Sequence, residues 1–146
     1  MTYHRRHGIA IVDTRKGILV VAGRGKQFIL PGGGANRGES RRDAAIRELR
    51  EETGLKAYSC KFLFSHVGSK HRSYKGGYFR NYSKVFLIKA KGKPRPKHEV
   101  KYIDYYKPNR KDIRLSYNTK LIIDKYFQHK KENSLIGRLK KFLKSF

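Results

Sequence analysis

Residues 33–55 read GGANRGESRRDAAIRELREETGL, and this stretch decides how the rest of the chain is interpreted. Its second half predicts a helix that begins at Ser40, because Ser40 and Asp43 have the spacing of a capping box. Gly54 lies just past the last predicted turn, where a glycine in the left-handed conformation commonly ends a helix. We therefore expect a capped helix whose apolar face, formed by Ile46, Leu49 and Thr53, packs on a sheet.

Three glutamates of this helix share one face. Glu48, Glu51 and Glu52 fall within an arc of roughly 100°, because spacings of three and four residues bring helical side chains together. Each like-charge pair destabilises a helix by roughly 0.2–0.5 kcal/mol, so the cluster needs a compensating charge. Carboxylate oxygens suit Mg²⁺, with Mn²⁺ as a substitute. The alternative is a solvated helix face that Arg47, Arg50 and the basic remainder of the chain neutralise.

The spacing of nine residues in the same stretch resembles the signature of the Nudix hydrolases. The matching residues are Gly33, Glu39, Arg47, Glu48, Leu49, Glu51, Glu52, Gly54 and Leu55. Nudix hydrolases are metal-dependent enzymes that cleave the pyrophosphate bond of a nucleoside diphosphate linked to another group. The resemblance implies an α+β fold, a Nudix α/β/α sandwich with a central mixed sheet. It also implies cleavage of a diphosphate linkage in a nucleoside di-, tri- or polyphosphate derivative by water attack at phosphorus.

The resemblance further assigns a metal site. The carbonyl of Gly33 is expected to be a ligand, and a residue without Cβ lets the backbone approach closely there. Glu51 and Glu52 are expected to be the main carboxylate ligands. Glu48 is expected to be either a ligand or the base that activates water. The expected catalytic residues within the motif are Arg47, Glu48 and Glu52.

Other residues are expected to support or complete the site. By resemblance, Glu39 and Arg47 form an ion pair that fixes the loop against the helix, and Gly54 has a structural role. The ordinary alternative for that pair is a surface salt bridge worth about 0–1 kcal/mol. The family places its general base either in the motif or on a downstream loop. Glu99 is the candidate outside the motif, although a lone acid before a strand is often only a surface charge.

The remainder of the chain is strongly basic. Its formal net charge is +25, and five of its 11 acidic residues lie within residues 33–55. Such a field concentrates polyanions, which include nucleoside polyphosphates, phosphorylated RNA ends and nonspecific nucleic acid. A basic bias of the host proteome would explain the charge equally well. The alternative function is therefore a nucleic-acid-associated Nudix protein that acts on 5′-phosphorylated RNA ends or binds RNA.

The long polar loop between Gly68 and Gly77 is a candidate lid or specificity loop. Tyr74 and Tyr78 are candidates to stack on a substrate base, as aromatic side chains do in nucleotide sites, or they only pack at the rim. Nudix enzymes specific for ADP-ribose often carry a proline some 15 residues beyond the motif. No proline occurs between Pro31 and Pro94, which disfavours an ADP-sugar substrate.

Apolar runs predict the remaining elements. Strands are expected over residues 8–12, 18–22, 28–30, 58–66, 78–90 and 100–106, with the first two as a hairpin. A helix is expected from Leu115 to Gln128, with Leu121, Ile122, Tyr126 and Phe127 facing the core. Cys60, the only cysteine, excludes an internal disulfide and is expected to fill the core.

The chain divides into a Nudix hydrolase domain over residues 1–131 and a basic amphipathic C-terminal helix or tail over residues 132–146. That last segment would lie on an anionic membrane surface, dock on a partner or fold back on the domain. No apolar run approaches the roughly 20 residues that span a bilayer, so we expect a cytoplasmic protein.

Overall fold

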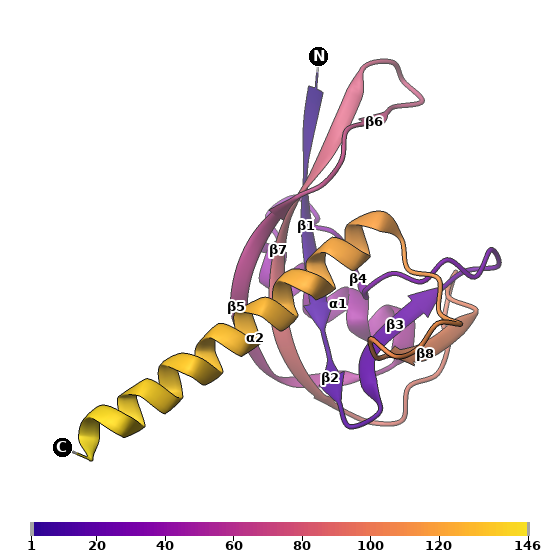
Figure 1. The fold of residues 1–146 in the computed structure, drawn as a ribbon. Helices are drawn as coiled ribbons and strands as arrows, with labels where there is room; N and C mark the ends of the chain where they lie inside the picture. Colours follow the sequence, from indigo (N-terminus) through magenta and orange to yellow (C-terminus); the bar gives the residue numbers. More distant parts are fainter. Residues whose placement is uncertain (1, 146) are drawn as a thin grey trace.

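Two sheets and two helices make up the computed structural model, which describes residues 2–145 (Figure 1). The larger sheet is mixed and has the strand order β4-β1-β7-β5, with β6 pairing with β7. Its strands are β1 (Thr2–Ile11), β4 (Gly32–Gly34), β5 (Lys56–Val67), β6 (His71–Arg72) and β7 (Tyr78–Lys91). The smaller antiparallel sheet contains β2 (Asp13–Thr14), β3 (Gly17–Ala22) and β8 (Tyr102–Tyr106). The helices are α1 (Arg41–Thr53) and α2 (Tyr117–Lys144).

The two helices cover opposite faces of the mixed sheet (Figure 1). Neighbouring residues of a strand point to opposite faces, so each strand supplies two cores. Ala10 of β1 packs in the same cluster as Leu49 of α1. Ile11, the next residue, packs in the same cluster as Ile123 of α2. The expected α+β sandwich with a central mixed sheet is confirmed.

The expected hairpin of residues 8–12 with residues 18–22 was wrong in its main part. β1 pairs in parallel with β7 along its whole length and antiparallel with β4, so it is an inner strand of the mixed sheet. Only β2 continues into the hairpin with β3, through the pairs Asp13–Ile18 and Thr14–Gly17. Residues 28–30 form isolated bridges instead of a strand, and the edge strand is Gly32–Gly34.

Helix α1 has the predicted caps. The Ser40 hydroxyl accepts a hydrogen bond of 3.0 Å from the Asp43 amide, and Gly54 closes the helix at φ 79° with its amide donating to Arg50. Leu49 and Thr53 are fully buried. The connector after β7 adds two more bonds, because the amides of Arg95 and Lys97 donate to the last carbonyls of α1, those of Thr53 and Glu52. The C-terminal end of α1 is therefore fixed both by its Gly54 cap and by the connector after β7.

A close backbone approach docks α1 on the sheet. A Cβ placed on Gly8 of β1 would lie 1.9 Å from the carbonyl oxygen of Arg41. No residue other than glycine fits there without moving the helix. A glycine inside a strand pattern is the only sequence sign of such an approach.

Helix α2 is longer than expected, and its buried face is shifted by about one residue from the expected face. Ile122 and Tyr126 face the core as predicted, but Ile123 is fully buried whereas Leu121 is 40% exposed. The helix continues without a break to Lys144, and residues 131–145 are all exposed, so the C-terminal segment does not fold back. Within residues 2–145, none of the helices is long and apolar enough to cross a membrane.

Candidate metal and catalytic site

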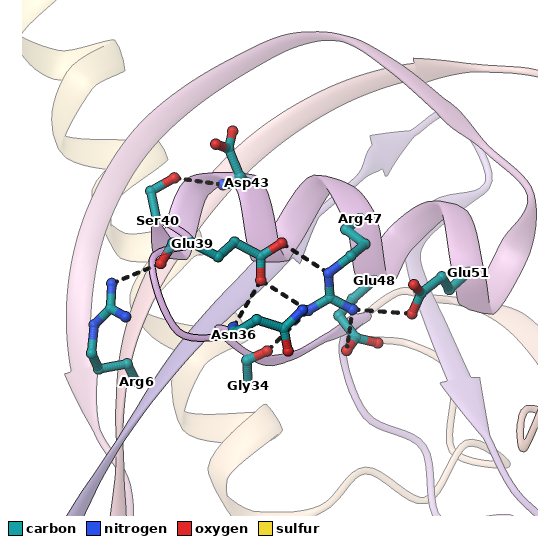
Figure 2. Close-up of polar contacts among 9 residues, drawn as sticks. All are labelled: Arg6, Gly34, Asn36, Glu39, Ser40, Asp43, Arg47, Glu48 and Glu51. Atoms are coloured by element: carbon teal, nitrogen blue, oxygen red, sulfur yellow. Dashed lines mark hydrogen bonds and ion pairs between the residues drawn. The ribbon is translucent and has the colours of Figure 1, made fainter.

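Arg47 is the centre of the polar network around the loop that precedes α1 (Figure 2). Its Nε and Nη2 donate to the two carboxylate oxygens of Glu39 at 2.9 and 3.0 Å, and Nη2 also donates to the carbonyl of Gly34 at 3.0 Å. Its Nη1 donates to Glu48 and to Glu51, each at 3.1 Å. A guanidinium has five N–H donors, and all five of Arg47 are used. The expected ion pair between Glu39 and Arg47 is present.

Glu39 joins the loop to this network. Besides Arg47, its carboxylate accepts a 3.0 Å bond from the amide of Asn36, and its backbone carbonyl accepts a bond from the guanidinium of Arg6. The hydrogen bonds from Arg47, then from Asn36, lower the pKa of Glu39 to about 2. The loop from Gly34 to Glu39 is thus tied to α1 and to β1 by charged contacts. Asn36 and Arg6 were missed by the sequence reasoning, because neither belongs to a recognisable pattern.

Glu52 is the buried carboxyl of the site. Its side chain is on the last turn of α1, the residue is only 5% exposed, and its Oε1 accepts a 2.9 Å bond from the amide of Gly32. Burial raises the pKa of Glu52 to about 8, against the lowering effect of the Gly32 bond, and Glu48, Glu99 and Glu51 add repulsion. A positive charge placed nearby would therefore stabilise its ionised form.

Gly33 makes room for Glu48. A Cβ on Gly33 would lie 2.5 Å from Oε1 of Glu48, so the absence of a side chain lets the carboxylate reach the loop. Burial raises the pKa of Glu48, with the Arg47 hydrogen bond acting in the opposite direction. The Gly33 backbone and the Glu48 carboxylate are thus close to each other in the structure.

Glu99 shares a cavity with Glu52. The cavity has a volume of about 250 Å³. Its lining includes the polar or glycine residues Gly32, Glu52 and Glu99 and the apolar residues Val21, Ile29 and Val100. The connector before Glu99 bonds to the last carbonyls of α1 through the amides of Arg95 and Lys97, and Glu99 itself is exposed.

The donor set has the chemistry that suits a hard divalent cation. Within residues 2–145, no three His, Cys, Asp or Glu side chains already form a group that could hold a metal ion. Arg47 and the Gly32 amide account for this, since they hold the carboxylates of Glu48, Glu51 and Glu52 in hydrogen bonds. These glutamates lie on one helix face with rotatable side chains, and carboxylate oxygens are the ligands that Mg²⁺ prefers. A buried carboxyl surrounded by carboxyls is also a setting that a cation would stabilise.

Tyr74 and Tyr78 lie at the other end of the mixed sheet. Tyr78 pairs with the first described residue of β1, whereas Gly32 beside Glu52 pairs with Ile9. At about 3.3 Å per residue, the two tyrosines are about 20 Å or more from the carboxylates along the strand. Tyr74 is fully exposed and Tyr78 is 44% exposed. The structure does not bring these two residues to the carboxylate cluster.

A row of polar side chains crosses the sheet between these two places. Gly34, His7, Ser83 and His66 are paired neighbours on β4, β1, β7 and β5. At about 4.8 Å per strand, His66 is about 14 Å from Gly34. His66 Nε2 and Asn81 Oδ1 are shielded atoms without a hydrogen-bond partner in the described part of the chain. The sequence reasoning missed this row, because its members lie far apart in the chain and meet only through strand pairing.

Known proteins share this arrangement. A family model described as NUDIX domain matches residues 2–117. A protein described as a Nudix hydrolase family member from Chromobacterium violaceum is 34% identical, with a TM-score of 0.73 over 91% of this chain and 88% of that chain.

Two more distant structures share the fold. A MutT NUDIX hydrolase from Burkholderia pseudomallei is 21% identical, with a TM-score of 0.61 over 83% of this chain and 96% of that one. A MutT protein from Bacillus halodurans is 19% identical, with a TM-score of 0.65 over 82% and 80%. Nudix proteins typically use a divalent metal, which agrees with the carboxylate face of α1. Because the family match covers most of the chain and the motif lies on α1 beside the glycine loop, this protein belongs to the Nudix family and is a Nudix hydrolase of the pyrophosphohydrolase class.

Proposed function

We propose that this chain is a Mg²⁺-dependent pyrophosphohydrolase that cleaves a diphosphate linkage in a nucleoside di-, tri- or polyphosphate derivative. The observation that carries the proposal is the environment of Glu52. A carboxyl that is 5% exposed, bonded to the Gly32 amide and surrounded by Glu48, Glu51 and Glu99 is costly to ionise without a cation. A divalent metal would account for a buried carboxyl that has three other carboxyls around it.

The proposed ligands are the carbonyl of Gly33 and the carboxylates of Glu48, Glu51 and Glu52. Mg²⁺ bound there would lower the pKa of a coordinated water and neutralise charge on the phosphate oxygens, and Mn²⁺ would substitute for it. Arg47 positions Glu48 and Glu51 through its Nη1 bonds and holds the loop through Glu39. Arg47 would thus be a positioning residue for the ligands.

In the proposed reaction, the oxygen of a water molecule forms a bond to one phosphorus of the diphosphate. The bond from that phosphorus to the bridging oxygen breaks, and its electron pair stays on the leaving phosphate. A carboxylate takes the proton from the attacking water. Glu99 suits this role because it lines the cavity that contains Glu52 without being one of the proposed ligands, and Glu48 is the alternative within the motif.

Substitution of Glu52 by glutamine tests the metal assignment. Glu52→Gln keeps the shape of the side chain and removes the charge that would bind the cation, so Mg²⁺-dependent turnover should fall by about 100-fold or more. The assay measures the products released from nucleoside triphosphates, dinucleoside polyphosphates and nucleotide sugars, with Mg²⁺, with Mn²⁺ and with a chelator.

Glu132→Gln is the matched control, because Glu132 is an exposed glutamate on α2 outside the site. It should hydrolyse at the parental rate. Thermal unfolding of all three proteins checks that the fold is intact. Parental activity in folded Glu52→Gln would show that the metal assignment is wrong.

A second candidate function is action on 5′-phosphorylated single-stranded RNA, which the exposed end of the mixed sheet favours. This end contains a cavity of about 360 Å³, and we name its lining the tip surface. The lining residues are Tyr3, Arg5, Ser73, Tyr74, Lys75 and Phe79. The Arg5 guanidinium lies 3.9 Å from the ring centroid of Phe79. The sequence has no acidic residue from Thr53 to His98. Exposed aromatic rings among basic side chains are the usual platform for single strands.

Strand β1 joins the two places, because it pairs with the Gly32–Gly34 edge at one end and lines the tip surface at the other. Tyr3, Arg5 and His7 alternate along the strand, so all three point to the face of the sheet that Ile11 shares with α2. The length of about 20 Å has room for several stacked nucleotides at roughly 3.4 Å each. The 5′ phosphates would then lie at the motif while the following bases reach the tip surface.

Binding of a 5′-phosphorylated oligoribonucleotide distinguishes the two candidates. In a Glu52→Gln background, Tyr74→Ala should weaken binding by about tenfold, because loss of one stacking ring costs about 1–3 kcal/mol. Tyr58→Ala is the control, since Tyr58 is 63% exposed at the opposite end of β5. Equal binding by the two variants would exclude the tip surface and leave free nucleotides as the substrates.

A further inference from the structure

Helix α2 consists of two parts with different surroundings. Its first half packs on the mixed sheet through buried residues that include Ile122, Ile123 and Tyr126. Its second half projects from the body of the protein, as the yellow end of the helix shows (Figure 1). Residues 131–145 are all exposed. A helical segment of this length that does not pack on the folded domain is marginal in water, so its surface needs an explanation.

The projecting half carries an exposed apolar stripe. Its members are Leu135, Ile136, Leu139, Phe142 and Leu143, each between 51% and 60% exposed. At 100° per residue they fall within an arc of roughly 120°. Contiguous exposed apolar side chains of this kind usually mark a binding surface.

This stripe does not continue the buried face of the first half. At 100° per residue, the centre of the arc of Ile122, Ile123 and Tyr126 is turned by roughly 150° from the centre of the exposed stripe. Lys130 confirms the direction of the body, because its ammonium contacts Asp13 at 3.0 Å. The stripe therefore faces away from the domain, and a flat surface can meet it without colliding with the sheets.

The charges around the stripe have one sign. Arg138, Lys140, Lys141 and Lys144 lie outside the apolar arc, and the sequence has no acidic residue after Glu132. Long basic side chains next to an apolar stripe can extend their charged ends toward anionic headgroups while their stems stay in apolar surroundings. A second copy of this chain would bring the same basic segment and another net charge of +25, so self-association through this face is disfavoured.

We propose that residues 134–144 of α2 bind the surface of an anionic lipid bilayer, with the apolar stripe in the headgroup region and the domain held on the aqueous side. An amphipathic helix with a basic polar face has the chemistry for such binding, and it lies on the membrane without crossing it. The proposal does not depend on the proposed hydrolase activity. It explains why the stripe is apolar and faces away from the domain, and why Arg138 and Lys140, which lie on its two sides, are basic.

Cosedimentation of the full-length protein with lipid vesicles tests the proposal. The parent should bind phosphatidylcholine vesicles that contain phosphatidylserine, should not bind pure phosphatidylcholine vesicles, and should be released by salt. Leu139→Asn removes the central residue of the stripe and should weaken binding by about tenfold. Lys140→Gln removes a charge that lies beside the stripe and should weaken binding by about fivefold.

Leu121→Asn is the matched control for the apolar stripe. Leu121 is the same residue type on the same side of the helix, 18 residues or five turns before Leu139, and it is 40% exposed but outside the stripe. Lys61→Gln, on exposed β5, controls for the loss of one charge. Both controls should bind vesicles as the parent does, and Leu139→Asn should unfold at the parental temperature.

Three outcomes would overturn the proposal. Equal binding by Leu139→Asn and the parent would show that the stripe is not the contact. Equal binding with and without phosphatidylserine would remove the role of the charges. A parental dimer that Leu139→Asn converts to a monomer would assign the stripe to a second copy. Hydrolysis of soluble nucleotides by Leu139→Asn, measured in parallel, reports separately on the proposed activity.

Discussion

At the residue scale, the site depends on which hydrogen-bond donors hold its carboxylates. Arg47 uses one nitrogen, Nη1, to hold both Glu48 and Glu51, while Glu52 is held by the Gly32 amide. The carboxylates are thus kept on one face by donors that a cation can replace. These hydrogen bonds therefore hold the proposed ligands in a preorganised arrangement.

Gly33→Ala tests that preorganisation. The new Cβ would occupy the position of the Glu48 carboxylate, so the side chain must turn away and hydrolysis should fall by about 100-fold. The fold should persist, because the displaced atoms are the end of a flexible side chain. Gly34→Ala is the control, since its nearest neighbour would be His7 Nε2 at an ordinary 3.7 Å. The test measures hydrolysis and thermal unfolding; an unchanged rate in Gly33→Ala would show that the Glu48 position does not matter.

At the element scale, α2 is anchored by one buried hydroxyl. Tyr126 is 4% exposed, and its hydroxyl donates to Asp13 of β2 at 2.7 Å. Burial, then the bond to Asp13 and its negative charge, raises the pKa of Tyr126 above the ordinary value of 10. Lys130 donates to the same carboxylate oxygen from the next turn of the helix. The hydrogen bond between α2 and β2 is therefore kept only while Tyr126 is protonated.

The expected pH dependence follows from that shift. Because the folded pKa is higher than the unfolded pKa, the contribution of Tyr126 is complete below pH 10 and is lost as the pH rises further. Tyr126→Phe should lower the free energy of unfolding by about 1.5 kcal/mol at neutral pH, since it removes a bond to a charged group. Denaturant unfolding from pH 7 upward should show the parent approaching the variant above pH 10. A constant difference through that range would contradict the assignment.

At the scale of the whole molecule, the net charge of +25 acts on stability and on encounter in opposite directions. Like charges repel within the folded chain, which destabilises the compact state. The same field attracts anionic substrates and increases their association rate. Ionic strength changes both effects, because the Debye length falls from about 30 Å at 0.01 M to about 8 Å at 0.15 M.

Raising the salt concentration over this range should therefore increase Tm and decrease kcat/KM. We expect Tm to rise by roughly 2–4 °C, the shift that about 1 kcal/mol produces in a domain of this size. Thermal unfolding and initial rates in the same series of sodium chloride concentrations measure the two quantities. A kcat/KM that is independent of salt would show that the charge does not assist substrate capture.

What the sequence by itself determined is local in the chain. The caps of α1, its buried face and the single face of Glu48, Glu51 and Glu52 follow from spacings of three and four residues, which the helical period makes visible. The motif spacing likewise indicated the family before any fold was known. The amphipathic pattern of the last residues also followed from the helical period, although its direction relative to the domain did not.

Tertiary structure alone decided which segments meet across long separations. β1 pairs with β7 and not with its neighbour β3, because strand pairing depends on the packing of two cores and not on local pattern. The connector that bonds to the end of α1 puts Glu99 in the cavity with Glu52, and the close approach at Gly8 sets α1 against the sheet. Because α2 is one continuous helix, the helical period places its last apolar stripe on the side that faces away from the domain. These contacts are long-range, so no window of sequence contains both partners, and only the folded chain shows them together.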